Sequence, residues 1–305
     1  MAKKRYNIDR ELNKITKVKA PGNIYLYPFV NLVLRSYKCK SDKDVTVIKH
    51  SFTGYKGDII KGLLIEPKQY SGSLPCVIFY HGGGLLLKAS GSHYITAKEY
   101  VKKANCKVFF PDYRLMPKHG YPVSLEDCYC AYKWILGNSK ELDIDTDKIV
   151  VAGDSAGGYL AAVVSMMLKE RDDIIPAGAI MTYPVIDYRM KTESMKKYTD
   201  TPIWDSKRNK MFWNAYLKEV KKEEMKYVSL SEEVTKDFPK TYIETAEFDC
   251  LHDEGVEFAD KLKEIGVPTD YYEIKKACHG YENASESRIM RESVERRIKW
   301  LSSVF

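Results

Sequence analysis

Ser155 lies in the sequence GDSAG, residues 153–157, which is a G-x-S-x-G motif. The motif follows the β-branched run Lys148–Gly153 and precedes the alanine-rich run Ala156–Asp172. A serine at such a strand-to-helix turn stands above the edge of a sheet, and the glycines leave room for the sharp bend. The N–H groups that open the following helix favour negative charge beside it. We therefore predict that Ser155 is a nucleophile.

A serine hydroxyl needs a base to take its proton, and the histidines of this chain are the candidates. One group of serine hydrolases built on α/β sheets carries its triad in the order serine, acid, histidine. Only His252 and His279 follow Ser155. His252 opens an expected helix, and we interpret it as a surface residue. His279 follows the last expected strand, where the catalytic loops of an open α/β sheet lie, so we predict that it is the base.

The orienting acid should lie near the end of the strand that precedes His279. The sequence there offers four carboxylates, Glu247, Asp249, Asp253 and Glu254. Asp249 ends the expected strand, and we choose it to hold the His279 ring and to stabilise the imidazolium. Asp253 and Glu254 fall in the first turn of the next helix, where acids favour the helix dipole. They remain the alternatives.

Three glycines follow His81 directly after an apolar run. Acyl transfer builds an oxyanion, which needs N–H donors that already point at it. Glycines let a carbonyl oxygen approach the backbone closely, so we predict that the N–H groups of Gly83, Gly84 and Ala156 form the oxyanion hole. Gly82 would shape the turn. His81 precedes the nucleophile, and we interpret it as a structural residue that anchors the loop.

The elements that must position these residues alternate between strand and helix from about Leu74 onward, which predicts a mostly parallel sheet with helices on both faces. The expected strands are Val45–Phe52, Ile59–Glu66, Leu74–Tyr80, Lys107–Tyr113, Lys148–Gly153, Ala177–Ile186, Thr241–Asp249 and Thr269–Lys275. The expected helices are Tyr94–Asn105, Ser124–Leu142, Ala156–Asp172, Glu254–Gly266 and roughly Ser285–Ser303.

Two segments interrupt this alternation: about residues 1–44 and an insertion of about residues 188–238. An insertion of that size between two strands is typical of a lid over the site. We therefore expect a single domain, residues 1–305, with a helical cap formed by both segments. The apolar run Ile24–Leu34 is too short to span a bilayer, and we interpret it as part of a helix that packs on the body.

The composition is that of a globular protein of 305 residues with 49 Lys and Arg against 42 Asp and Glu. Most lysines alternate with acids, and no nucleic-acid-binding motif occurs, so we expect no nucleic-acid partner. Seven irregularly spaced cysteines without a CxxC pair indicate reduced thiols and a cytoplasmic location. No motif indicates a metal or a cofactor, and we expect neither.

Taken together, the motifs HGGG (residues 81–84), GDSAGG (153–158), DCLHDEG (249–255) and HGY (279–281) resemble those of the hormone-sensitive-lipase-like carboxylesterases of the α/β-hydrolase fold. The segment PDYRLMPKHGYP, residues 111–122, is similar to another signature of that family. The resemblance implies Ser155, Asp249 and His279 as the triad, and the three predicted N–H donors as the oxyanion hole. It also implies the cap. The oligomeric state stays open, with the family's frequent homodimers as one candidate.

Two residues depart from the family pattern: Lys118 replaces a usual glutamate, and Cys250 replaces a usual proline. Neither takes part in the chemistry, and both bear on local loop geometry. Six apolar residues have two interpretations, lining of an acyl or alcohol pocket or ordinary packing: Leu85, Leu86, Leu87, Trp204, Phe212 and Trp213.

The sequence thus predicts a serine carboxylesterase that hydrolyses small esters with short acyl chains, such as acetyl or butyryl, through an acyl-enzyme. An amidase or acyl-transferase with the same triad is the first alternative. The second is a non-catalytic binding protein on the same fold, as in the gibberellin receptors, which have lost the catalytic histidine. The presence of His279 argues against that alternative.

Overall fold

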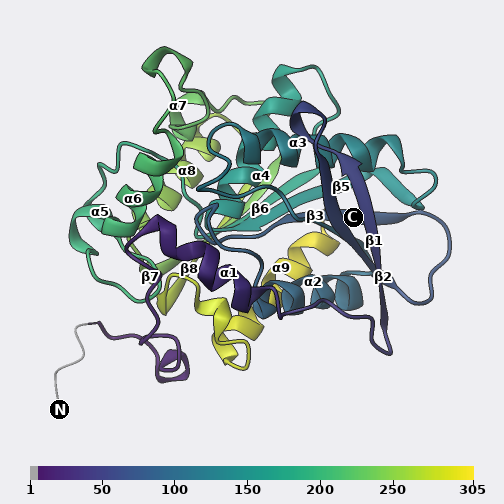
Figure 1. The fold of residues 1–305 in the computed structure, drawn as a ribbon. Coiled ribbons are helices and arrows are strands. Elements are labelled where there is room, and N and C mark those ends of the chain that lie inside the picture. The colour runs from purple at the N-terminus through teal and green to yellow at the C-terminus, as the bar shows by residue number, and fades with distance from the viewer. Residues whose placement is uncertain (1–5) are drawn as a thin grey trace.

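The computed structural model describes residues 6–305, and its centre is an eight-stranded sheet (Figure 1). The strand order is β1-β2-β4-β3-β5-β6-β7-β8. Strand β2 runs antiparallel to both of its neighbours, and all the other pairs are parallel. The bounds are β1 Val45–Thr53, β2 Ile59–Pro67, β3 Leu74–Tyr80, β4 Lys107–Pro111, β5 Ile144–Asp154, β6 Gly178–Thr182, β7 Lys240–Phe248 and β8 Thr269–Cys278.

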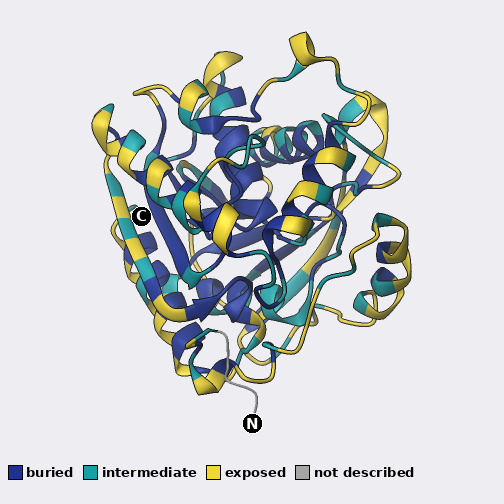
Figure 2. Ribbon diagram, turned by 90° about the vertical axis from the view of Figure 1, so that its left-hand side faces the viewer, coloured by how far each residue is buried: buried dark blue, intermediate teal, exposed yellow. Residues whose placement is uncertain are grey.

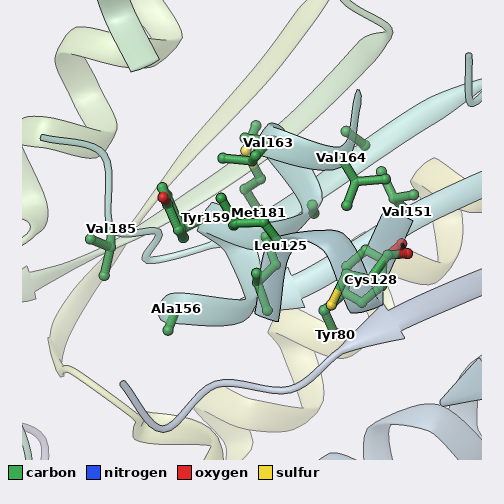
Figure 3. Close-up of a cluster of buried hydrophobic side chains, with 14 of the residues drawn as sticks. Tyr80, Leu125, Cys128, Val151, Ala156, Tyr159, Val163, Val164, Met181 and Val185 are labelled. Atoms are coloured by element: carbon green, nitrogen blue, oxygen red, sulfur yellow. Dashed lines mark hydrogen bonds between the residues drawn. The ribbon is translucent and has the colours of Figure 1, made fainter. Parts of the chain in front are cut away.

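Helices cover both faces of the sheet, as its fully buried central strands require. One apolar cluster joins α3, α4 and α8 to the sheet, and Figure 3 shows part of it, with Tyr159 and Val163 of α4 near Leu125 of α3. A second cluster joins α2 and α9 to the other face. Figure 2 shows the resulting buried centre. These helices are α2 Gly91–Ala104, α3 Val123–Gly137, α4 Ala156–Glu170, α8 His252–Glu264 and α9 Arg288–Ser302.

The two segments that interrupt the alternation contact each other. The N-terminal segment contains α1, Tyr27–Leu34, and the insertion between β6 and β7 contains α5 Glu193–Lys197, α6 Ser206–Tyr216 and α7 Leu230–Glu233. Short 3-10 turns complete the chain at Arg10–Leu12, Ile24–Leu26, Tyr55–Gly57, Lys222–Glu224 and Tyr281–Asn283. The N–H of Ala20 donates to the carbonyl of Ile203, and the N–H of Ile203 donates to the carbonyl of Val18, at 3.1 and 2.8 Å.

The structure confirms the α/β-hydrolase fold, and the predicted elements differ from the observed ones mainly at their ends. The strand expected at Ala177–Ile186 stops at Thr182, because Tyr183 turns to a positive φ of 37° and donates its N–H to Glu244 of β7. Strand β5 begins at Ile144, earlier than expected, because Ile144 pairs with Leu74 across a bulge. Within residues 6–305, no helix is both long and apolar enough to cross a bilayer.

Candidate active site

The turn between β5 and α4 holds Ser155 in a strained conformation, with φ 54° and ψ −120°. The turn is possible only because its glycines lack a side chain. A Cβ on Gly157 would lie 2.0 Å from the carbonyl oxygen of Tyr80, and one on Gly153 would lie 2.2 Å from that of Gly157. Neighbouring backbone fixes the turn in place, since the N–H of Ser155 donates to the carbonyl of Thr182 at 2.8 Å.

The structure brings together the three residues that the sequence predicts as a triad. The Ser155 hydroxyl lies 2.9 Å from His279 Nε2, and His279 Nδ1 lies 2.6 Å from Asp249 Oδ2. All three side chains are buried, and they come from the ends of β5, β7 and β8. The other Asp249 oxygen accepts the N–H of Leu251 at 3.0 Å, which fixes the carboxylate plane. A carboxylate on Nδ1 leaves Nε2 free to accept the serine proton.

The two alternative acids have other partners. Asp253 accepts the N–H of Ser194 at 2.7 Å and bonds to the ring of His252 at 2.7 Å. Glu254 is buried and accepts the N–H groups of Ile186 and Asp187 at 3.2 and 3.3 Å. Burial raises the pKa of Glu254 well above its ordinary value of 4.5. The geometry therefore favours Asp249 as the partner of His279.

The glycine loop after β3 lies beside the nucleophile. Gly83 and Gly84 have positive φ values of 113° and 63°, which favour glycine. Within the described chain, neither of their N–H groups has a protein acceptor. The N–H of Ala156 is the first of α4, and the first four N–H groups of a helix have no partner inside it. These three groups are therefore available to an oxyanion.

A carboxylate next to the nucleophile holds the glycine loop in place. Asp154 Oδ1 accepts the N–H of Gly82 at 2.9 Å, and His93 Nε2 of α2 lies 3.1 Å from the same oxygen. Burial alone would lower the pKa of His93, but the Asp154 carboxylate outweighs it and raises this pKa. Burial would raise the pKa of Asp154, but His93 and the Gly82 N–H lower it. His93 Nδ1 accepts the N–H of Ser90 at 2.8 Å, which leaves Nε2 to donate its N–H to the Asp154 carboxylate.

His81 supports the loop from behind. Its Nδ1 donates to the carbonyl of Gly82 at 2.8 Å, and its ring stacks on Tyr113, with the centroids 4.5 Å apart. The Tyr113 hydroxyl donates to the His81 carbonyl at 2.6 Å. Burial, together with His93, lowers the pKa of His81 to about 4, so its ring is neutral near pH 7. This environment agrees with the structural role expected for His81.

The six apolar residues that the sequence interprets either as pocket lining or as ordinary packing fall into two groups. Trp204 of the insertion lies directly over the site. A Cβ on Gly84 would meet its ring at 2.8 Å, and its ring centroid lies 6.3 Å from that of His279. Phe212 and Trp213 pack behind it on α6. Leu85 and Leu86 are fully buried, and Leu87 is partly buried against the same core.

A buried polar network behind His279 was not foreseen from the sequence. The Tyr183 ring packs against the His279 ring at 4.7 Å, and its hydroxyl donates to Glu282 at 2.7 Å. Glu282 and Glu244 both face the fully buried Arg297 of α9. No motif marks these residues, because they become neighbours only when α9 packs on the sheet. His93 carried no signal for the same reason.

Comparisons with known proteins agree with this fold. A family model described as alpha/beta hydrolase fold matches residues 77–283. Esterase LipI of Mycobacterium tuberculosis is 30% identical over 209 residues, which are 68% of this chain and 65% of that protein. An ethyl acetate hydrolase of Pseudomonas putida is 26% identical over 262 residues, 82% of each chain.

The solved structures include a bacterial heroin esterase with a TM-score of 0.88 and 25% identity, covering 98% of both chains. The likeness therefore extends over the N-terminal segment and the insertion as well as the sheet. The match to LipI, by contrast, spans just under two thirds of that relative's length. From its family match and its fold, this chain belongs to the alpha/beta-hydrolase family, among the hormone-sensitive-lipase-like carboxylesterases.

Proposed function

We propose that the chain is a serine carboxylesterase that hydrolyses small esters through an acyl-enzyme. The observation that carries the proposal is the continuous hydrogen-bonded line from Ser155 through His279 to Asp249. Ser155 Oγ attacks the ester carbonyl carbon while His279 Nε2 takes the hydroxyl proton. The Asp249 carboxylate stabilises the imidazolium that forms, and it remains ionised throughout.

The carbonyl oxygen becomes an oxyanion that accepts the N–H groups of Gly83, Gly84 and Ala156. The imidazolium of His279 then returns its proton to the departing alcohol, which leaves the acyl group on Ser155. Water attacks the acyl-enzyme with His279 again as the base, and the carboxylic acid leaves. The whole cycle needs only groups that this chain supplies and water.

We propose further that the N-terminal segment and the insertion together cap the site and restrict the acyl group to a short chain. Two observations support this. Trp204 lies against Gly84 and close to His279, which leaves little room over the nucleophile. The buried ring of Phe212 closes the space behind Trp204. The name of the Pseudomonas putida relative, an ethyl acetate hydrolase, agrees with acetyl esters as substrates.

For the location we propose the cytoplasm, since all seven cysteines are free thiols.

The test is hydrolysis of p-nitrophenyl acetate, butyrate and octanoate by the wild type and by Ser155→Ala. We expect turnover that falls from the short esters to octanoate, and a kcat roughly 10⁵-fold lower in the variant. Ser165→Ala is the matched control, because Ser165 lies in α4, the helix that follows Ser155, and its hydroxyl bonds to the carbonyl of Ala161. It should keep wild-type kinetics.

Two results would refute the esterase proposal: no ester turnover by the wild type, or full activity in Ser155→Ala. Parallel assays with p-nitroacetanilide distinguish an esterase from an amidase with the same triad. An esterase should hydrolyse the anilide far more slowly than the acetate ester. Preference for octanoate over acetate would leave the triad standing and overturn the short-chain proposal.

A further inference from the structure

Helix α1 departs from the usual pattern for a helix on a globular protein, because its solvent-facing side is apolar as well as its inward side, where Val30 and Leu34 are half-buried. Its buried residues are Tyr27 and the polar Asn31, whereas Phe29, Leu32 and Val33 are 67%, 61% and 65% exposed. A helix on a water-exposed surface normally turns its apolar side inward and its polar side outward. Scattered apolar residues on a surface need no explanation, but a contiguous apolar patch marks an interaction site.

The apolar face extends beyond the helix. Tyr25, Leu26 and Tyr37, which flank α1, are each at least half exposed. Together with Phe29, Leu32 and Val33 they form what we call the α1 patch. Figure 1 shows helix α1 itself in front of the sheet. Half a dozen large apolar side chains within 13 residues of sequence give a surface of the kind that enters an apolar phase.

The charge around the α1 patch selects the partner. No Asp or Glu occurs between Glu11 and Asp42, whereas six cations do: Lys14, Lys17, Lys19, Arg35, Lys38 and Lys40. Within the described chain, Arg35, Lys38 and Lys40 have no carboxylate at ion-pair distance. A groove of about 870 Å³ begins at the C-terminal end of α1, and its lining adds Lys49 and Lys61. Lys88 also lines it but pairs at 2.6 Å with Asp112, the one carboxylate of that lining. Apolar side chains surrounded by cations match an anionic bilayer, which offers both an apolar interior and negatively charged headgroups. An anionic protein surface would match only the cations.

Helix α1 is also joined to the catalytic loop. Asn31 Nδ2 donates to the carbonyl of Leu86, and Asn31 Oδ1 accepts the N–H of Lys88, both at 2.8 Å. Leu86 and Lys88 follow Gly84, a predicted oxyanion donor, by two and four positions. A surface bound to α1 is therefore connected to the site by one side chain.

From this placement we propose that the α1 patch docks the protein on an anionic lipid surface, with α1 lying in the plane of the headgroups. Phe29, Leu32 and Val33 would enter the boundary between headgroups and acyl chains, and the flanking cations would contact lipid phosphates and carboxylates. No segment spans the bilayer. The docking goes beyond the proposed hydrolysis, because it needs neither Ser155 nor turnover.

The test is flotation of the full chain with vesicles of phosphatidylcholine alone or of phosphatidylcholine with phosphatidylserine. We expect binding to the anionic vesicles that weakens as salt is added, and much weaker binding to the neutral ones. Ser155→Ala should float as the wild type does, so failure of docking and failure of the esterase proposal are distinguishable.

Two variants test the patch itself. Phe29→Gln/Leu32→Gln/Val33→Gln should bind the anionic vesicles about 100-fold less tightly, since each lost side chain removes apolar burial. The matched control, Ile59→Gln/Ile95→Gln/Ile174→Gln, changes three exposed residues elsewhere and should bind like the wild type. Arg35→Glu/Lys38→Glu/Lys40→Glu should abolish the preference for anionic vesicles. Circular dichroism verifies that each variant folds.

Three results would overturn the proposal: no binding of the wild type to anionic vesicles, equal binding to both vesicle types, or wild-type binding by the α1 triple variant. Size-exclusion chromatography with light scattering tests the other possible partner of the α1 patch, a second copy of this chain. We expect the same mass for the wild type and the α1 triple variant. A dimer that becomes a monomer in the variant would assign the patch to a protein interface instead.

Discussion

At the scale of single residues, the glycines after β3 do two separable things. Their positive φ values let the chain turn, and the absence of side chains leaves the loop surface open to a carbonyl oxygen. Gly84 shows both, because a Cβ there would be strained and would also meet the ring of Trp204. Another glycine of the chain separates the two effects: Gly72 has a φ of 66°, close to that of Gly84, with open space around it.

We predict that Gly72→Ala loses about 1 kcal/mol of stability from backbone strain and that Gly84→Ala loses more, because its Cβ also meets the ring of Trp204. Only Gly84→Ala should lose kcat, by about 100-fold or more, because the new methyl group displaces Trp204 or the N–H donor. Thermal unfolding and p-nitrophenyl acetate kinetics measure the two effects. Equal kcat values in both variants would remove Gly84 from the oxyanion hole.

The acid of the triad gives a second residue-scale prediction. Asp249→Asn should lower kcat by about 10⁴-fold, since an amide cannot stabilise the imidazolium and favours the wrong tautomer of His279. Asp253→Asn is the control, because its carboxylate bonds to Ser194 and His252 instead. Steady-state kinetics of the two variants decide between the two carboxylates. Loss of as much activity in Asp253→Asn as in Asp249→Asn would contradict the assignment of Asp249.

Much of the candidate site could be predicted at this scale because its residues occur in short motifs with a known order. Ser155, Asp249 and His279 each stand at the end of a strand, and strand ends are visible in the hydrophobic pattern. The partners that set their environment were not visible. His93 and Arg297 are ordinary helix residues in sequence, and only the packing of α2 and α9 brings them to Asp154 and Glu282.

At the scale of elements, the His93–Asp154 pair connects α2 to the β5 turn and, through Gly82, to the oxyanion loop. The raised pKa of His93 means that its stabilising effect is fully present below the ordinary value of 6.5 and is lost as the pH rises through the folded-state pKa. The lowered pKa of Asp154 means that its effect is present above 3.8 and is lost only at lower pH.

We therefore predict that His93→Gln loses about 2 kcal/mol of unfolding free energy between pH 4 and 6.5, since it removes the ring N–H that donates to a buried carboxylate. The difference from the wild type should shrink as the pH rises well above 6.5. Urea unfolding over this pH range measures it. Loss of His93 should also let Asp154 and the glycine loop that it holds shift, which should lower kcat about tenfold with little change in KM. A stability difference that is constant with pH would contradict the raised pKa of His93.

The element boundaries show where local pattern stops being enough. Strands β1 to β4 occupy nearly the expected residues, because their apolar pattern is regular. Helix α2 begins at Gly91 instead of Tyr94, and helix α3 ends at Gly137 instead of Leu142. Strand β5 gained residues at its start through a bulged pairing with β3, which has no local signal. Helix α1 forms within the apolar run Ile24–Leu34 as expected, but most of its apolar side chains face outward instead of packing on the body.

At the scale of the whole molecule, the parallel sheet collects the site at one edge. The ends of β3, β5, β7 and β8 carry the glycine loop, Ser155, Asp249 and His279 in turn. The alternation of strands and helices predicts a mostly parallel sheet with helices on both faces, so the fold class was predictable from the sequence. The arrangement of the insertion over that edge was not, because its short helices carry no pairing register.

The two hydrogen bonds of Asn31 bear on how this protein can be divided. A shortened chain that begins at β1 would keep the whole sheet and every group of the proposed triad. It would also leave the carbonyl of Leu86 and the N–H of Lys88 without their amide partner, in the segment that continues from the oxyanion glycines. Leu86 is fully buried in the complete chain. The segment that carries α1 thus belongs with the loop after β3, and we expect an expression fragment that begins at β1 to have a misformed loop.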